Sequence, residues 1–196
     1  RRQRKMGIGD VYDGDTMEAC LPVDVLTDPP LYRVHGVPPA YLEETQSIDL
    51  AALPIPTETP ESILLRLLSF PDIAGKEWIF RQYDHQVQTN TLQAPGGDAA
   101  VLRIKGTGKS IALTTDGNGR YCYLDPFVGG IIAVAEACRN LACVGAEPIA
   151  LTDCLNFGNP ERPEVYYQLE QCVDGMTKAC QEMDLPVISG NVSLYN

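Results

Sequence analysis

Several hallmarks of common protein classes are missing from this 196-residue sequence. It contains no run of about 18 apolar residues, which argues against a membrane-spanning helix. The G-x-x-x-x-G-K-[ST] phosphate loop and the G-x-G-x-x-G dinucleotide fingerprint are both absent. Histidine is scarce: His35 and His85 are the only two, and neither has an evident acid–base partner in the sequence. We therefore expect no membrane interaction and no general nucleotide-binding motif.

Basic residues are also in short supply. The chain has 15 Lys and Arg against 26 Asp and Glu, and its formal net charge is −11. Such a surface repels a phosphate-rich polymer, so nucleic-acid binding is disfavoured. The one dense basic run, at positions 1–5, has no apolar stretch behind it and is interpreted as a frayed end rather than a targeting arm.

Cysteine is present, but its spacing indicates neither a disulfide framework nor a zinc site. The seven cysteines form no C-x-x-C pair, and no histidine lies near them in the sequence. An odd count without a signal peptide is typical of a reducing compartment, where free cysteine behaves as a small buried hydrophobe. We expect structural thiols in a cytoplasmic protein.

The first part of the chain is interrupted by turn formers. Residues 6–26 hold short apolar stretches broken by glycines, which predicts one or two strands. Prolines and acidic residues dominate 28–60 and predict a linker without regular structure. A helix is predicted to begin after Thr59, because Thr-Pro-Glu supplies an N-cap, a first-turn proline and an early acid, and it ends before Pro71.

Beyond Trp78 the pattern alternates between strands and helices. A hairpin is predicted over 99–115, with its turn at 105–109. The further predicted elements are a helix from Asp125-Pro126 to Gly145, a strand at 148–155, a helix at 162–183 and a strand at 186–188. The first of these helices has an Ala- and Gly-rich face and is expected to be buried along most of its length. The order β-β-α-β-α-β predicts an α/β (α+β layered) fold.

Polar residues gather at three predicted strand ends, around Asp116, Asp153 and Asn191. If the strands are adjacent, these oxygen ligands could converge on one Mg²⁺–nucleotide site. Each segment also has a plainer interpretation, since Asp-Gly and Asn-Gly pairs form ordinary turns and Asp or Asn side chains cap nearby backbone. From spacing alone both interpretations stay open.

Longer stretches resemble a known family. Arg-Gln-Tyr-Asp-His-Gln-Val-Gln at 81–88, Asp-Gly-Asn-Gly-Arg-Tyr at 116–121 and Ser-Gly-Asn-Val-Ser-Leu-Tyr-Asn at 189–196 are similar to the second half of phosphoribosylformylglycinamidine synthases. So are 95–100, 133–148 and 153–160. The resemblance covers nearly everything from Phe80 onward, and 21–31 resembles the join between the two homologous halves of that enzyme.

The resemblance implies a fold and a domain order. The fold would be an incomplete aminoimidazole-ribonucleotide-synthase-like (PurM-like) N-terminal domain. Residues 1–31 would be the tail of a preceding AIR-synthase-like C-terminal domain, 32–78 a Pro-rich linker and helix, and 79–196 the truncated second N-terminal domain. Two related halves would pack as a pseudo-dimer and share a site for ATP, Mg²⁺ and formylglycinamide ribonucleotide.

The resemblance also implies an activity and its residues. ATP would activate the formamide oxygen of the ribonucleotide, and ammonia from a glutaminase subunit or domain would displace phosphate. By position in the motifs, Asp153 and Gly190 would contact ATP, Asn191 would ligate Mg²⁺ and Ser193 would touch the ribonucleotide. The catalytic histidines and most Mg²⁺ carboxylates of the family belong to the first half, which would precede Arg1. We therefore assign no catalytic residue here and expect the chain alone to be inactive.

The partners implied are that first half, the glutaminase and, as a further candidate, a small accessory subunit. Two alternatives to the ligase remain: a structural nucleotide-binding half with no direct part in the chemistry, and another member of the AIR-synthase superfamily. The amino-acid sequences of 116–121 and 189–193 argue against another member of the superfamily. The roles of His85 and Asp116, and whether the parent is a small-type or large-type enzyme, stay open, although the compact spacing leans to the small type.

Overall fold

The computed structural model describes residues 9–22, 24, 27–28 and 31–196. The chain divides into two compact units between Val34 and His35. In the first unit, the strands β1 (Asp10–Asp13) and β2 (Thr16–Cys20) pair antiparallel. This hairpin confirms the strands predicted within 6–26, as far as those residues are described. The basic run at positions 1–5 lies outside the described residues.

The segment predicted to be an irregular linker contains a helix. Helix α2 (Ala40–Gln46) begins after Pro39 and buries Leu42. The ring of Tyr41 stacks on that of Tyr123, with 4.1 Å between centroids, and its hydroxyl donates to the Tyr123 carbonyl and accepts from the Gln168 amide. These partners are about 80 and 127 residues away in the sequence. The prediction was wrong here because tertiary contacts, which local composition does not reveal, hold the helix.

The helix predicted after Thr59 is confirmed. Helix α3 (Pro60–Ser69) has Thr59 as its N-cap, and the Thr59 hydroxyl accepts from the Ser62 N–H at 3.3 Å. It is followed by the short helix α4 (Glu77–Phe80). The remaining short elements of this region are the 3-10 turns η1 (Leu50–Ala52) and η2 (Val87–Thr89).

The predicted hairpin is confirmed and gains a third strand. Strands β4 (Ala100–Arg103) and β5 (Ser110–Leu113) pair antiparallel in continuous register. Strand β3 (Thr91–Gln93) adds to β4 with a register irregularity. It was missed because three residues are too few for a period-two pattern to stand out.

Two predicted helices are confirmed and a third was missed. Helices α6 (Pro126–Cys143) and α7 (Pro163–Glu182) match their predicted positions, and Asp125 caps α6 by accepting from the Val128 N–H at 3.0 Å. Helix α5 (Gly119–Leu124) begins where the sequence indicated only a turn. Asn118 caps it through a 3.0 Å bond from the Arg120 N–H. An Asn-Gly pair fits both a turn and a helix start, which explains the miss.

The core lies between α6 and α7. Val134 is 1% exposed and packs with Ala179, Cys180 and Leu185. The expectation that α6 is buried along most of its length was wrong, because the structure buries Pro126, Gly129, Gly130 and Val134 and leaves the rest of the helix partly or fully exposed. By length and composition alone α6 is apolar enough to cross a membrane, a test that core helices of water-soluble folds also pass.

Glycines let the three helices approach closely. A Cβ added at Gly130 would overlap the Cys172 backbone, and one at Gly129 would lie 2.5 Å from the Cys122 Cα atom. Because the obstacle is backbone, it cannot swing aside. Replacing Gly130 with Ala is therefore expected to lower the free energy of unfolding by about 1–3 kcal/mol, as overpacking of tight cores does. Urea denaturation would measure the loss.

The control for this change is Gly108→Ala. Gly108 lies in the hairpin turn with open space around it and an unexceptional backbone conformation. Its replacement is expected to leave the unfolding midpoint almost unchanged. Equal midpoints for the Gly130 and Gly108 variants would contradict the close packing of α6 on α7.

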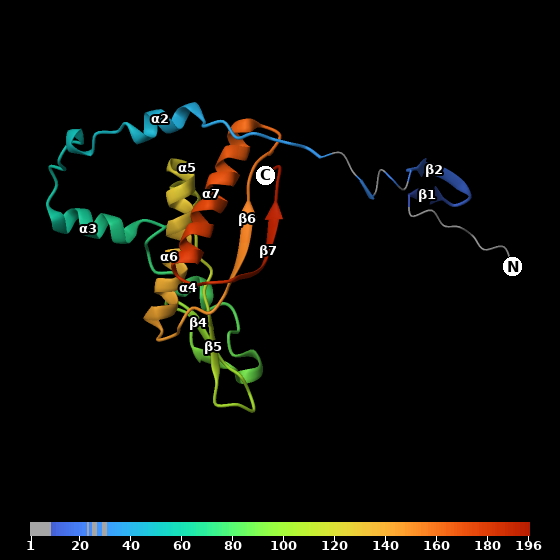
Figure 1. Ribbon diagram of the computed structural model, residues 1–196. Coiled ribbons are helices and arrows are strands. Elements are labelled where there is room, and N and C mark those ends of the chain that lie inside the picture. Colours follow the sequence, from blue (N-terminus) through green and yellow to red (C-terminus); the bar gives the residue numbers. More distant parts are fainter. Residues whose placement is uncertain (1–8, 23, 25–26, 29–30) are drawn as a thin grey trace. The chain divides into compact units, whose positions relative to one another are not determined.

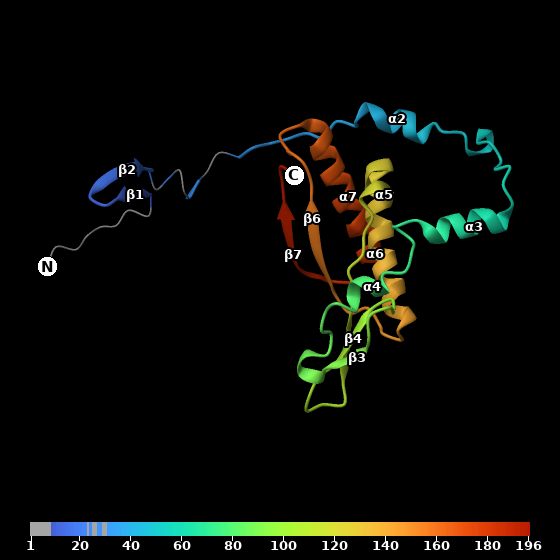
Figure 2. The same cartoon turned by 180° about the vertical axis from the view of Figure 1, so that it is seen from behind.

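A parallel strand pair completes the fold. Strands β6 (Leu151–Asn156) and β7 (Val187–Ser193) pair in parallel, and α7 forms the crossover between them. Figures 1 and 2 show α7 running beside this pair. Strand β7 is longer than predicted, because residues 189–193, which the sequence placed beyond the strand end, continue it. Those residues read as a turn in isolation, but pairing with β6 supplies their backbone partners.

Candidate functional site

Asp153 and Gly190 are direct neighbours across the β6–β7 pair. They stand opposite each other in the parallel register. A Cβ at Gly190 would overlap the carboxylate of Asp153, 2.5 Å from its Oδ2 atom. Only glycine leaves room for the Asp153 carboxylate at this point. The pairing of β6 with β7 and the missing side chain at Gly190 together leave a space, here called the cradle, which the Asp153 carboxylate fills.

Asn191 and Ser193 take positions on the other face of the same strand pair. Side chains alternate along a strand, and β6 alternates between half-buried and exposed residues. Asn191 stands opposite Cys154 and Ser193 opposite Asn156, both of which are exposed. The four residues predicted from the sequence thus share two adjacent strands, with Asp153 and Gly190 on one face and Asn191 and Ser193 on the other.

Asn196 fastens the ends of the two strands together. Its side-chain amide donates to the carbonyls of Phe157 at 3.2 Å and Ser193 at 2.9 Å, and its Oδ1 accepts from the Ser193 hydroxyl at 3.2 Å. The adjacent Tyr195 has a φ of 65°, a left-handed conformation that costs a residue with a side chain free energy. Sequence reasoning did not single out Asn196. Its place at the end of the Ser-Gly-Asn-Val-Ser-Leu-Tyr-Asn stretch was the available signal.

The remaining polar segment contains Asp116, whose carboxylate accepts hydrogen bonds from two other side chains of the domain. Its Oδ2 accepts from the Thr114 hydroxyl and its Oδ1 from the Asn140 amide, each at 2.6 Å. Asn140 belongs to α6, so the carboxylate ties the loop before α5 to that helix. These hydrogen bonds use one acceptor position on each carboxylate oxygen.

The described residues contain no group of three His, Cys, Asp or Glu side chains that could hold a metal ion. Oxygen donors are nevertheless present on the strand pair, namely the Asp153 carboxylate and the Asn191 amide. Mg²⁺ commonly takes one or two protein oxygens and fills its remaining positions with water and phosphate. The donor set fits one protein contribution to such an ion rather than a complete site.

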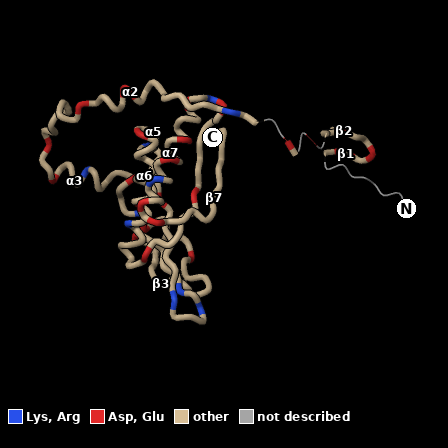
Figure 3. The backbone as a smooth tube through the Cα atoms, in the orientation of Figure 1, with Lys and Arg blue, Asp and Glu red and all other residues tan. Residues whose placement is uncertain are grey.

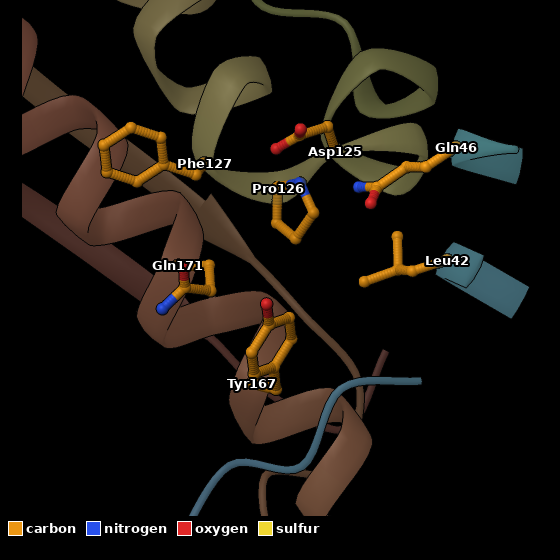
Figure 4. A pocket seen from close by; sticks show the side chains of 7 residues that line it. All are labelled: Leu42, Gln46, Asp125, Pro126, Phe127, Tyr167 and Gln171. Carbon is orange, nitrogen blue, oxygen red and sulfur yellow. The ribbon is translucent and has the colours of Figure 1, made fainter. Parts of the chain in front are cut away.

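Two pockets lie away from the strand pair. One, of about 250 Å³, has Leu42 and Gln46 of α2 facing Tyr167 and Gln171 of α7, with 125–127 completing the wall (Figure 4). The other, of about 380 Å³, borders β3 and β4 and includes His85 in its lining. The His85 carbonyl accepts from the Thr91 hydroxyl. Neither pocket contains the four residues predicted from the resemblance.

The combination of a β-α-β unit, an antiparallel hairpin sheet and paired covering helices defines a layered α/β domain. The family model described as "AIR synthase related protein, N-terminal domain" matches residues 96–196. The chain belongs to this family, and the fold class expected from the resemblance is confirmed.

Two curated relatives bear out the sequence resemblance. The "Phosphoribosylformylglycinamidine synthase subunit PurL" of Moorella thermoacetica is 56% identical over 191 residues, which cover 97% of this chain and 26% of the relative. The protein of the same name from Alkaliphilus metalliredigens is 55% identical over 95% of this chain and 25% of its own length. The chain thus spans about a quarter of the length of the curated relatives it matches.

Solved structures give the same result. The structure of PurLQS from Thermotoga maritima has a TM-score of 0.65 and 30% identity, over 95% of this chain and 28% of the other. T. maritima PurL complexed with ATP matches over the same shares with a TM-score of 0.60 and 29% identity. T. maritima PurL complexed with FGAR has a TM-score of 0.61 and 30% identity, over 95% of this chain and 27% of that one.

Proposed function

We propose that this chain is part of an ATP-dependent carbon–nitrogen ligase of purine biosynthesis. The reaction joins ammonia derived from glutamine to formylglycinamide ribonucleotide and yields formylglycinamidine ribonucleotide, ADP and phosphate. The observation that carries the proposal is the identity of 56% to a phosphoribosylformylglycinamidine synthase subunit across nearly the whole chain. The solved PurL complexes with ATP and FGAR support the choice of substrates.

Within that reaction the strand pair would bind the nucleotide. Asp153 would contact ATP through its carboxylate, and Gly190 would do so through the backbone beside that carboxylate. Asn191 and Ser193 lie on the other face of the strand pair. A nucleotide that contacts residues on both faces would therefore have to cross the edge of β7 near Gly190. Ser193, whose hydroxyl is oriented by Asn196, would contact the ribonucleotide.

Magnesium would reach this site through Asn191 as one oxygen ligand, with the nucleotide phosphates and water as others. When bound, the ion would neutralise charge on the transferring phosphoryl group. The strand pair's own contribution is to hold Asn191 and Asp153 on neighbouring strands, one residue apart in register. Further carboxylates would come from a preceding homologous half of the enzyme.

The domain order proposed from the resemblance is a preceding-domain tail at 1–31, a linker with a helix at 32–78 and an AIR-synthase-like domain from 79. The partners proposed are the first half of the enzyme, a glutaminase subunit or domain and a small accessory subunit. The match to a structure named PurLQS supports an assembly of several subunits. We place the protein in the cytoplasm, a choice supported by its seven free cysteines.

Nucleic-acid and membrane partners are not proposed. Figure 3 shows the Lys and Arg positions interspersed with acidic ones along most of the chain, with a small group near the β4–β5 turn, which contains Lys105 and Lys109. A group of this size offers few phosphate contacts. Helix α6 uses its buried residues to pack within the domain, against α5 and α7.

The test is a substrate-dependence assay on the full-length protein that carries this chain. With Mg-ATP and ammonium, ADP formation is expected to depend on added formylglycinamide ribonucleotide and to disappear when that substrate is left out. Coupled enzymes that detect ADP would follow the rate. Turnover of formylglycinamidine ribonucleotide instead would assign the protein to the aminoimidazole-ribonucleotide-synthase branch and overturn the proposal.

A second candidate is a nucleotide-holding half without a direct part in the chemistry. The small set of metal donors among the described residues favours it. It predicts that ATP raises the melting temperature of the full-length protein through Asp153, while the Asp153→Asn variant keeps its turnover. If Asp153→Asn lost both the stabilisation by ATP and the turnover, this candidate would be rejected in favour of the ligase site.

A further inference from the structure

Two cysteines from different helices meet in the helical layer. Cys122 lies on α5 and is half-buried, and Cys172 lies on α7 and is 5% exposed. Their sulfur atoms are 3.9 Å apart, close to van der Waals contact. The two residues are separated by 50 positions in the sequence. Only the packing of the helices brings these thiols together.

The close approach depends on α6, which contacts both helices through two adjacent glycines. Gly129 faces the Cys122 backbone and Gly130 faces the Cys172 backbone, and neither position has room for a Cβ. One turn along α7, a Cβ at Gly175 would overlap the Phe127 carbonyl. Three glycines therefore fix how α5 and α7 lie against α6, and the sulfur–sulfur distance follows from that packing.

The two thiols differ in chemical character. The Cys172 thiol donates to the Cys122 sulfur, which stabilises the Cys122 thiolate and lowers its pKa to about 7. The same contact and burial raise the pKa of Cys172. The lowered pKa favours the thiolate of Cys122, which is the reactive form of cysteine. The pair has a half-exposed nucleophile and a buried resolving thiol next to it.

We propose that Cys122 and Cys172 form a peroxide-sensitive dithiol that closes as a disulfide between α5 and α7. In the first step the Cys122 thiolate attacks hydrogen peroxide; a sulfur–oxygen bond forms, the oxygen–oxygen bond breaks and hydroxide leaves. In the second step the Cys172 sulfur attacks the sulfenic acid, loses its proton and displaces hydroxide, which departs as water. In sum, two thiols and one peroxide give one disulfide and two waters.

Closure has a defined structural consequence. Helix α5 follows the segment of Asp116 directly and is separated from α6 by the single residue Asp125. A bond from α5 to α7 would fix the C-terminal end of this segment to the core of the domain. Reduction by cellular thiols would release it, as expected for a disulfide formed in a reducing compartment.

The experiment uses the full-length protein carrying this chain. It is treated with hydrogen peroxide, its remaining thiols are alkylated, and peptides are mapped by mass spectrometry without reduction. A cross-linked peptide joining Cys122 to Cys172, two hydrogens lighter than the separate peptides and lost on treatment with dithiothreitol, is the expected result. In the Cys172→Ser variant this peptide is lost, and Cys122 is instead labelled by dimedone as a sulfenic acid.

The matched control is Cys143→Ser. Cys143 is an exposed cysteine at the end of α6, and its loss is expected to leave the cross-link unchanged. The proposal is overturned if Cys122 and Cys172 are alkylated as free thiols after peroxide treatment, or if Cys122 pairs with another cysteine or proceeds only to the sulfinic acid. Because wild-type protein alone decides between these results, a folding defect in a variant cannot obscure the answer.

Discussion

Replacing Asp153 with Asn in the full-length protein is expected to lower kcat by about 100-fold, the scale seen when one preorganised charged or polar group is lost from an active site. The change keeps the size of the side chain and removes its negative charge. Because the carboxylate sits in the cradle opposite Gly190, its loss would remove a fixed charge from the proposed nucleotide site without creating a cavity. Steady-state kinetics with saturating formylglycinamide ribonucleotide would measure it.

The control for Asp153 is Asp174→Asn. Asp174 is an exposed carboxylate on α7, and its neutralisation changes the net charge by the same amount. Its kcat is expected to stay within about twofold of wild type, since surface charges away from a site contribute little. If the two variants had equal rates and unchanged melting temperatures, Asp153 would have no role at the site.

The second large effect is expected for Gly190→Ala. The added methyl group would occupy the place of the Asp153 carboxylate. Since that carboxylate is the far end of a flexible side chain, it can rotate away, so the loss in free energy of unfolding should stay below about 1 kcal/mol. Turnover, by contrast, should fall nearly as far as in Asp153→Asn, because the carboxylate leaves its position.

A double-mutant cycle separates this account from general damage to the sheet. If Gly190→Ala acts by moving the carboxylate, then adding it to Asp153→Asn should cost far less turnover than it costs alone. Independent, multiplying losses would mean that the methyl group blocks the nucleotide directly. A large drop in melting temperature would instead point to distortion of the β6–β7 pairing.

Elements whose signals are local were predicted well. The N-caps at Thr59 and Asp125 act through bonds within three residues, so the starts of α3 and α6 could be predicted from short sequence windows. The hairpin of β4 and β5 is likewise encoded in its turn. Helix α2 was not found, because its stability depends on Tyr41 contacts with Tyr123 and Gln168, which lie in other helices.

The candidate site shows the same difference between features with a local sequence signal and features that depend on contacts between distant segments. The motifs placed Asp153 and Gly190 on two strands, but the sequence had no means of showing that the strands pair directly or that the two residues stand opposite each other. Register is a property of two segments at once. The contact of Cys122 with Cys172 was invisible for the same reason, since it arises from glycines on a third helix.

The β6–β7 pair has a consequence for handling the protein. Within the described residues this parallel sheet consists of two strands, whereas parallel sheets normally have more strands and cover on both faces. Val187, Ile188 and Val192 are exposed along β7. An open apolar edge recruits further strands, either from its proper neighbours or from other copies of the same chain. The 196 residues by themselves would therefore tend to self-associate at high concentration.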